Sequence, residues 1–252
     1  MVDLTGLAPA AVEGWWFLLD LTAEEPHACL LVGGQMVHVL IVEHGGEPVR
    51  TTVDVDVVVN VRIRPDGTRW LSSWLTARAF EFAGASPDGV GHRFTRPATL
   101  GPGTVIFDVL GPDGLGSRTS LTTAPPARTI EVPGATQALR RSELVAISAT
   151  GAGARDVRMG QVRRPSLLGA LVAKAAATTI AARSNPERDW QDAAILSTLI
   201  DDPRSMAAAC DRKDRQRLRR LRPLSDLTHN GWDGIDRHAR RQGAAALSFL
   251  ID

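Results

Sequence analysis

The run from Val53 to Val59, VDVDVVV, constrains the fold most, because valine fills five of its seven positions. Such a run is typical of a buried β-strand. Asp54 and Asp56 interrupt it, although Asp is disfavoured in strands and a buried carboxylate costs several kcal/mol unless it is compensated. Residues i and i+2 share one face of a strand, so the two carboxylates should project side by side. The chain therefore places either a cation or a frayed, solvated strand end at this point.

A third carboxylate, Asp108, interrupts another apolar run, TVIFDVL. If the two strands are neighbours, Asp54, Asp56 and Asp108 converge on one patch, where their repulsion grows as water is excluded. A divalent cation removes that penalty, and hard oxygen ligands are those that Mg²⁺ takes. The sequence therefore predicts a Mg²⁺ (or Mn²⁺) site formed by these three carboxylates.

Composition limits the protein class. The 252 residues are 44% hydrophobic and 23% charged with a net charge of +1, so any basic surface must be local. The two cysteines are far apart in the sequence, which favours a reducing compartment and argues against a disulfide or zinc framework. The N-terminus has no basic leader pattern, and the longest apolar run, CLLVGGQMVHVLIV, is too short for a bilayer. We expect a cytoplasmic protein that does not enter a membrane.

Sequence character changes once, near residue 136. Before it, β-branched runs alternate with Gly/Pro turns, and a helical pattern appears near WLTARAFEFAG; the expected strands are ACLLVGG, TTVDVDVVVNVRI, GTVIFDVLG and ARTIEVPG. After it, Ala, Leu and Arg dominate, and three helices are expected in PSLLGALVAKAAATTIAARS, ERDWQDAAILSTLIDD and RSMAAACDRKDRQRLRRL. We predict an α+β protein with an α/β domain over residues 1–135 and a mainly helical domain over residues 136–252.

Several further residues suit nucleotide binding. Gly33 and Gly34 follow a short apolar strand, and a glycine pair that opens a helix lets phosphate approach backbone N–H groups; the alternative is a plain turn. Lys174 lies in an alanine-rich helix, from which its side chain could extend into solvent. Asp189 and Asp192 share one helix face near its start, where acidic residues are also favoured as caps.

These motifs together resemble the AbiEii/MenT-type nucleotidyltransferases of the DNA polymerase β-like superfamily. The first family motif, GSxxLxxxxRxTxDxD, is matched at Gly33, Gly34, Arg50, Thr52, Asp54 and Asp56. The later motif, a Lys, an Arg and then RDxxDL, is matched at Lys174, Arg183, Arg188, Asp189 and Asp192. Three departures stand out: the insertion IVEHGGEP lengthens the first motif, GS is GG, and the final Leu is Ala193.

The resemblance implies a polymerase-β-like domain, a short mixed sheet flanked by helices, followed by a helical C-terminal domain. It implies a Mg²⁺-dependent transfer of a nucleoside monophosphate from an NTP, with pyrophosphate released. Asp54, Asp56 and Asp108 would hold the metal and, with Asp192, form the catalytic set. Nucleotide-binding roles are implied for Gly33, Gly34, Arg50, Thr52, Lys174 and Asp189.

Several acceptors are compatible with the sequence. By resemblance the acceptor is a tRNA 3′ end or another RNA, and the protein is the toxin of a toxin–antitoxin pair with a cognate antitoxin as partner. The basic run from Asp211 to Pro223 could hold RNA phosphates or be a solvated helix face. The alternatives are a small-molecule, antibiotic-type nucleotidyltransferase and a catalytically silent nucleotide- or RNA-binding module of the same fold.

Overall fold

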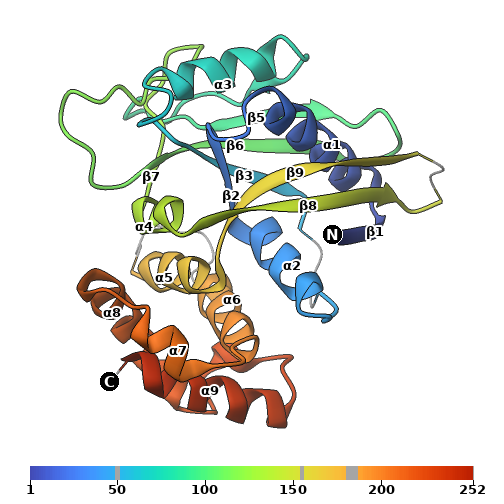
Figure 1. Ribbon diagram of the computed structural model, residues 1–252. Coiled ribbons are helices and arrows are strands. Elements are labelled where there is room, and N and C mark those ends of the chain that lie inside the picture. Colours follow the sequence, from blue (N-terminus) through green and yellow to red (C-terminus); the bar gives the residue numbers. More distant parts are fainter. Residues whose placement is uncertain (49–51, 154–155, 180–186, 252) are drawn as a thin grey trace.

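The computed structural model describes residues 1–48, 52–153, 156–179 and 187–251. The chain forms two β-sheets with helices on both sides and a group of helices at its C-terminal end (Figure 1). The expected mixed α+β class is confirmed, whereas the polymerase-β-like identity of the fold remains a prediction.

The larger sheet contains the strands that carry the three carboxylates. Its order is β2-β3-β6-β5-β4, with β7 beside β6. The strands are β2 (Cys29–Val32), β3 (Asp54–Val59), β4 (Glu81–Phe82), β5 (Arg93–Pro97), β6 (Thr104–Pro112) and β7 (Glu131–Val132). β3 and β6 run parallel, while β2 and β5 flank them in antiparallel pairing, so the sheet is mixed.

The smaller sheet has the order β1-β8-β9, formed by β1 (Val2–Leu7), β8 (Ser142–Gly151) and β9 (Val157–Pro165). Few strands were expected after residue 136, and β8 and β9 were not among the strands that the sequence predicted. The two segments contain few β-branched residues, and non-local contacts decide their state: β8 pairs with β1, and the Trp16 indole N–H donates to the Ala149 carbonyl over 3.2 Å.

Two helices cover the sheets. α1 (Pro9–Glu24) packs on the valine face of β3, so closely that a Cβ on Gly14 would lie 3.0 Å from a Val55 methyl. α3 (Gly67–Thr76) ends where the helix near WLTARAFEFAG was expected to continue. The chain instead turns through Ala79, which has a positive φ of 62°, into β4.

The remaining helices link the sheets to the C-terminal end (Figure 1). α2 (Gly33–Glu43), α4 (Ala135–Arg140), α5 (Leu167–Ala177) and α6 (Glu187–Thr198) lie nearest the sheets; α7 (Pro203–Ala208), α8 (Arg212–Leu218), the 3₁₀ turns η1 (Arg219–Ser225) and η2 (Asn230–Trp232), and α9 (Arg237–Ile251) follow. One helix was expected over residues 204–221. The chain breaks there because Asp211 caps α8 and forms a capping box with Asp214.

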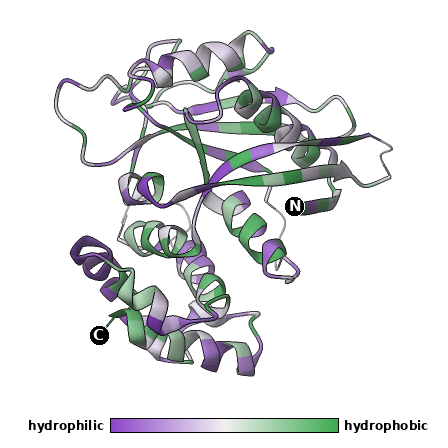
Figure 2. Cartoon of the chain, viewed as in Figure 1, coloured by the Kyte–Doolittle hydropathy of each residue, from purple (hydrophilic) through white to green (hydrophobic). Residues whose placement is uncertain are grey.

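One hydrophobic core runs through both parts of the chain. Apolar residues follow α1, α2, α5 and the central strands, whereas α8 is strongly hydrophilic (Figure 2). Trp15 of α1 and Trp232 of η2 are both fully buried in this core. Within the described ranges, none of the helices has the length and apolar character needed to cross a bilayer.

Candidate functional site

The three predicted carboxylates meet on one face of the larger sheet. In the parallel pairing of β3 with β6, Asp56 lies opposite Asp108 and Asp54 lies opposite Ile106. Asp54, two residues before Asp56, shares its face. The expected adjacency of the two carboxylate-bearing strands is therefore confirmed, while a metal-binding role stays a prediction.

The burial of β3 explains why it tolerates carboxylates. Val55, Val57 and Val59 are buried on the face that α1 covers. On the other face only Val58 is buried, in a small cluster with residues of α4 and α5. Asp54 and Asp56 precede Val58 on this face and are half-buried. β3 is thus rich in valine because one of its faces is buried under α1. Its two carboxylates lie on the opposite face, at the end of the strand that is only half-buried.

Arg93 of β5 pairs with these carboxylates, a contact that the sequence did not predict. Its Nε donates to Asp108 Oδ1 over 2.9 Å and its Nη2 to Asp108 Oδ2 over 2.7 Å. The same Nη2 also reaches Asp54 Oδ2 at 3.4 Å. The alternation in HRFTRP would have suggested a strand, but only the pairing of β5 with β6 places Arg93 opposite Asp108.

Titration behaviour follows from these contacts. Burial raises the pKa of Asp54, Arg93 opposes that shift, and the nearby Asp108 adds to it. The hydrogen bonds to Asp108 raise the pKa of Arg93, which stays charged at any physiological pH. His92 Nε2 lies 3.9 Å from Asp108 Oδ2, but burial lowers the pKa of this imidazole. The site therefore contains a permanent positive charge from Arg93 and little from His92 at neutral pH.

The glycine pair lies directly against the carboxylates. β2 ends beside Asp56, and α2 begins at Gly33 with a positive φ of 68°. A Cβ on Gly33 would stand 1.8 Å from Asp56 Oδ2, and one on Gly34 would stand 2.8 Å from Thr52 Oγ1. Both positions therefore need glycine, and the N-terminus of α2 faces the site with its positive dipole end. Gly33 and Gly34 therefore open a helix and do not form a plain turn.

Gln35 holds Thr52 in place beside the glycine pair. Its side-chain amide donates to the Thr52 carbonyl over 2.7 Å and accepts from the Trp15 indole over 3.0 Å. Thr52 is thereby held beside Gly34 and just ahead of β3. Arg50 and Arg183, which also belong to the predicted motifs, lie outside the described residues.

Lys174 forms a buried ion cluster with the two predicted aspartates of α6. Its Nζ lies 3.1 Å from Asp189 Oδ1 and 2.7 Å from Asp192 Oδ2. Burial opposes the charge on Lys174, but the two carboxylates outweigh it and raise the pKa of the ammonium. The alternative of a lysine extending into solvent is therefore wrong, since its side chain is only 9% exposed.

The ion cluster adjoins the carboxylate site. Asp192 lines the same small hollow as Gly34 and Thr52. Arg188, one residue before Asp189, is close enough to Asp54 to oppose the rise that burial causes in the pKa of Asp54. The two motif regions, separated by more than a hundred residues in the sequence, thus meet where α6 packs beside α2.

The donor chemistry of the site suits a divalent cation. All the donors of Asp54, Asp56 and Asp108 are carboxylate oxygens, and Gly33 leaves open the space that a side chain would fill against Asp56. As the side chains stand, the described part of the chain has no group of three or more His, Cys, Asp or Glu residues arranged around a metal position. The guanidinium of Arg93 instead holds both oxygens of Asp108.

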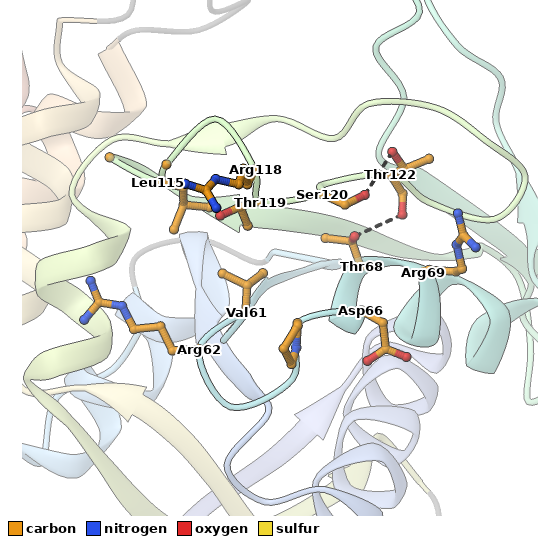
Figure 3. A pocket seen from close by; sticks show the side chains of 13 residues that line it. Val61, Arg62, Asp66, Thr68, Arg69, Leu115, Arg118, Thr119, Ser120 and Thr122 are labelled. Carbon is orange, nitrogen blue, oxygen red and sulfur yellow. Dashed lines mark hydrogen bonds between the residues drawn. The ribbon is translucent and has the colours of Figure 1, made fainter.

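Two larger hollows lie at the opposite end of β3 and β6. One, of about 680 Å³, opens between the segments after these strands, and Arg62, Arg69 and Arg118 line it together with several hydroxyl groups (Figure 3). The second, of about 630 Å³, shares Arg62 and Gly114 with the first. We call the two together the basic groove, defined by Arg62, Arg69, Arg118, Arg140, Lys213, Arg217 and Arg220.

The basic run from Asp211 to Pro223 contributes only in part to this groove. Lys213 and Arg220 are exposed and line it. Arg217 also lines it, but its guanidinium bonds Asp113 at 2.6 Å. Arg212, Arg219 and Arg222 are exposed and are not among the lining residues. The run is thus partly groove wall and partly solvated surface.

No protein-family model matches the sequence, and no curated protein is significantly similar to it.

Proposed function

We propose that this chain is an AbiEii/MenT-type nucleotidyltransferase with a polymerase-β-like catalytic domain, which moves a nucleoside monophosphate from an NTP to an acceptor in the presence of Mg²⁺ or Mn²⁺. One observation carries the proposal: Asp54, Asp56 and Asp108 share one sheet face directly beside the Gly33–Gly34 helix start. An all-oxygen anionic donor set next to backbone donors for phosphate is what binding a metal–triphosphate requires.

The residues divide into three roles in this proposal. Asp54 and Asp56 would hold the metal ion, which when bound neutralises charge on the triphosphate. The N–H groups at the start of α2 would bind phosphate oxygens, with Thr52 at their side. Asp108 would complete the metal site and accept the proton of the acceptor hydroxyl, while the hydroxyl oxygen bonds to the α-phosphorus and the bond to pyrophosphate breaks.

The Lys174 cluster has a supporting role here. Lys174 was expected to reach the triphosphate, but its ammonium is held by Asp189 and Asp192. In this arrangement the cluster fixes α5 against α6 and so positions α6 beside Gly34 and Thr52. Nucleotide contact by Lys174 or Asp189 and catalysis by Asp192 remain predictions that require this cluster to open.

An RNA acceptor, with a tRNA 3′ end as the specific candidate, is supported by the basic groove. Its seven cationic side chains come from both halves of a chain whose net charge is only +1. A polyanion is the natural partner of such a concentrated charge. A toxin role with a cognate antitoxin follows only from the family resemblance. The groove favours RNA over a small-molecule acceptor, which would not require it. The position of Asp56 beside Gly33 favours an enzyme over a silent module, which would not require this carboxylate.

The deciding experiment incubates the purified protein with each labelled NTP, Mg²⁺ and total RNA. We expect label in RNA with wild type, none with EDTA, and none with Asp56→Asn. Asp88→Asn, at an exposed position, is the matched control and should transfer normally. Normal transfer by Asp56→Asn would refute the assigned site, and nucleotide binding without transfer to RNA or small molecules would indicate the silent module.

A further inference from the structure

Arg93 occupies the position between two strands where the carboxylates need a cation. Its guanidinium binds both oxygens of Asp108 on β6 and reaches Asp54 on β3. This two-pronged geometry is the strong form of the arginine–carboxylate bond. Arg93 thus compensates part of the negative charge of Asp54 and Asp108.

The two partners differ in their freedom to move. The Asp108 side chain is 7% exposed and belongs to the central strand of the sheet, whereas that of Arg93 is 43% exposed. A long, half-exposed arginine can swing towards solvent by changing rotamers, and such changes are fast. The carboxylates, in contrast, are fixed by β3 and β6. Release of this pair therefore means movement of Arg93.

We propose that Arg93 is an internal counter-cation that stabilises the carboxylates while no metal is bound and is displaced when the metal–nucleotide arrives. This inference rests on the proposed function. Each charge keeps a counterion in this exchange: one guanidinium leaves the carboxylates, a divalent cation takes its place, and the displaced guanidinium gains the incoming phosphates as a new anionic partner. A metal ion alone must compete with Arg93 and receives no such compensation.

The consequence is that binding of the metal and binding of the nucleotide are coupled. Without nucleotide, displacement of Arg93 leaves its charge in solvent and weakens metal binding. With nucleotide, the phosphates bind Arg93 and the metal together, so each ligand increases the affinity for the other, as linkage requires. Arg93 acts in this scheme as a positioning residue, because it sets when the carboxylates are available.

The test is a Mn²⁺ titration followed by electron paramagnetic resonance, with and without a non-hydrolysable NTP analogue. Arg93→Gln removes the charge but retains a polar side chain of intermediate length. We expect it to bind Mn²⁺ alone about tenfold or more tightly than wild type, where tenfold corresponds to about 1.4 kcal/mol. The analogue should strengthen Mn²⁺ binding strongly in wild type and only weakly in the variant.

Arg96→Gln is the matched control. Arg96 lies on the same strand, but it contacts the Arg78 carbonyl and the Phe17 ring. Its Mn²⁺ affinity and its response to the analogue should equal those of wild type. Arg93→Lys keeps the positive charge but loses the two-pronged bond of the guanidinium, so its Mn²⁺ affinity should lie between those of wild type and Arg93→Gln. It also provides a second variant if Arg93→Gln does not fold.

The outcomes separate the two proposals. If Asp56→Asn abolishes Mn²⁺ binding but Arg93→Gln and Arg93→Lys bind Mn²⁺ as wild type does, the counter-cation role is wrong and the nucleotidyltransferase proposal stands. If wild type and Arg93→Gln both fail to bind Mn²⁺ with or without the analogue, the metal site itself is wrong, and both proposals fall with it.

Discussion

At the residue scale, the site is organised by compensation of buried charge. Arg93 pairs with Asp54 of β3 and Asp108 of β6, and Lys174 pairs with both aspartates of α6. The two cations differ in exposure: Arg93 is half-exposed and can leave, while Lys174 is enclosed. This difference assigns exchange to Arg93 and structural support to Lys174.

Lys174 gives the prediction at this scale. Alanine at this position looks tolerable from helix propensity alone, but Lys174→Ala or Lys174→Met would leave Asp189 and Asp192 buried without their ammonium partner. We expect Lys174→Met to lose about 3–5 kcal/mol of unfolding free energy at neutral pH, measured by urea denaturation. Because the folded-state pKa of Lys174 is raised, the stabilisation it gives is fully present below the unfolded value of 10.5 and is lost as the pH rises through the folded value.

Lys213→Met is the control, since Lys213 is exposed on α8. It should change the unfolding free energy by less than about 0.5 kcal/mol. Equal stability of Lys174→Met and wild type would show that the buried cluster is not formed. The variant Lys174→Met/Asp189→Asn/Asp192→Asn should recover much of the stability, because the two side chains that faced the lost ammonium are then uncharged.

At the element scale, the short contacts at strand and helix ends decide how the two halves of the chain join. Asp113 lies just beyond β6 and accepts hydrogen bonds from the backbone N–H groups of Gly134 and Thr136 at the start of α4. The same carboxylate pairs with Arg217 of α8. One side chain thus ties β6 to both α4 and α8. Its place in a GPDG sequence predicts a turn but gives no sign of these partners.

Asp113→Asn tests this junction through pH. Burial opposes ionisation of Asp113, but its hydrogen bonds outweigh that effect and lower its pKa below 3.8. A lowered folded-state pKa gives stability that is present above the unfolded value and is lost as the pH falls through the folded one. We expect Asp113→Asn to lose about 1.5–3 kcal/mol at neutral pH, with the difference shrinking below a pH of about 4. Denaturant unfolding of wild type and Asp113→Asn across this pH range measures the difference in unfolding free energy, with Asp201→Asn at an exposed position as the control. A difference that does not depend on pH would contradict a stabilising role of ionised Asp113.

The elements also show which parts of the fold the sequence could predict. Runs with a clear period were sufficient for β2, β3, β6 and α6. β8 and β9 were missed because their strand state depends on pairing with each other and with β1, which no local pattern records. The predicted site residues Asp56, Asp108 and Gly33 do meet, because β3 pairs with β6 in a register that places Asp56 opposite Asp108 and because Gly33 lies against Asp56. Arg93 could not be predicted, because its partner is set by which strand lies beside β6.

At the scale of the whole molecule, the carboxylate site and the basic groove occupy opposite ends of the same two strands. Asp113, beside the groove, follows Asp108 by five residues, which at about 3.3 Å per residue is roughly 16 Å. Under the proposed function, an acceptor that contacts both the groove and the carboxylate site would have to be extended over this distance.

Charge reversal in the groove tests this arrangement. Arg217 is unsuitable because a glutamate there would face Asp113 and damage the junction. Lys213, Arg220 and Arg118 are exposed lining residues, so we choose Arg118→Glu/Lys213→Glu/Arg220→Glu. Labelling of RNA should fall, and its dependence on salt should flatten by about 0.9 in logarithmic slope for each phosphate that is no longer neutralised. Binding of NTP should be unchanged, because the groove lies at the other end of the strands.

The matched control reverses three exposed arginines that do not line the groove, in Arg222→Glu/Arg237→Glu/Arg241→Glu. Both triple variants change the net charge equally, so an effect of overall charge must appear in both, whereas an effect of specific phosphate binding must appear only in the groove variant. Equal decreases in RNA labelling in the two triple variants would show that the overall charge of the protein, and not the groove, affects labelling. Full RNA labelling with an unchanged salt slope in the groove variant would show that the groove does not bind the acceptor and that RNA reaches the site around Asp54, Asp56 and Asp108 by another surface.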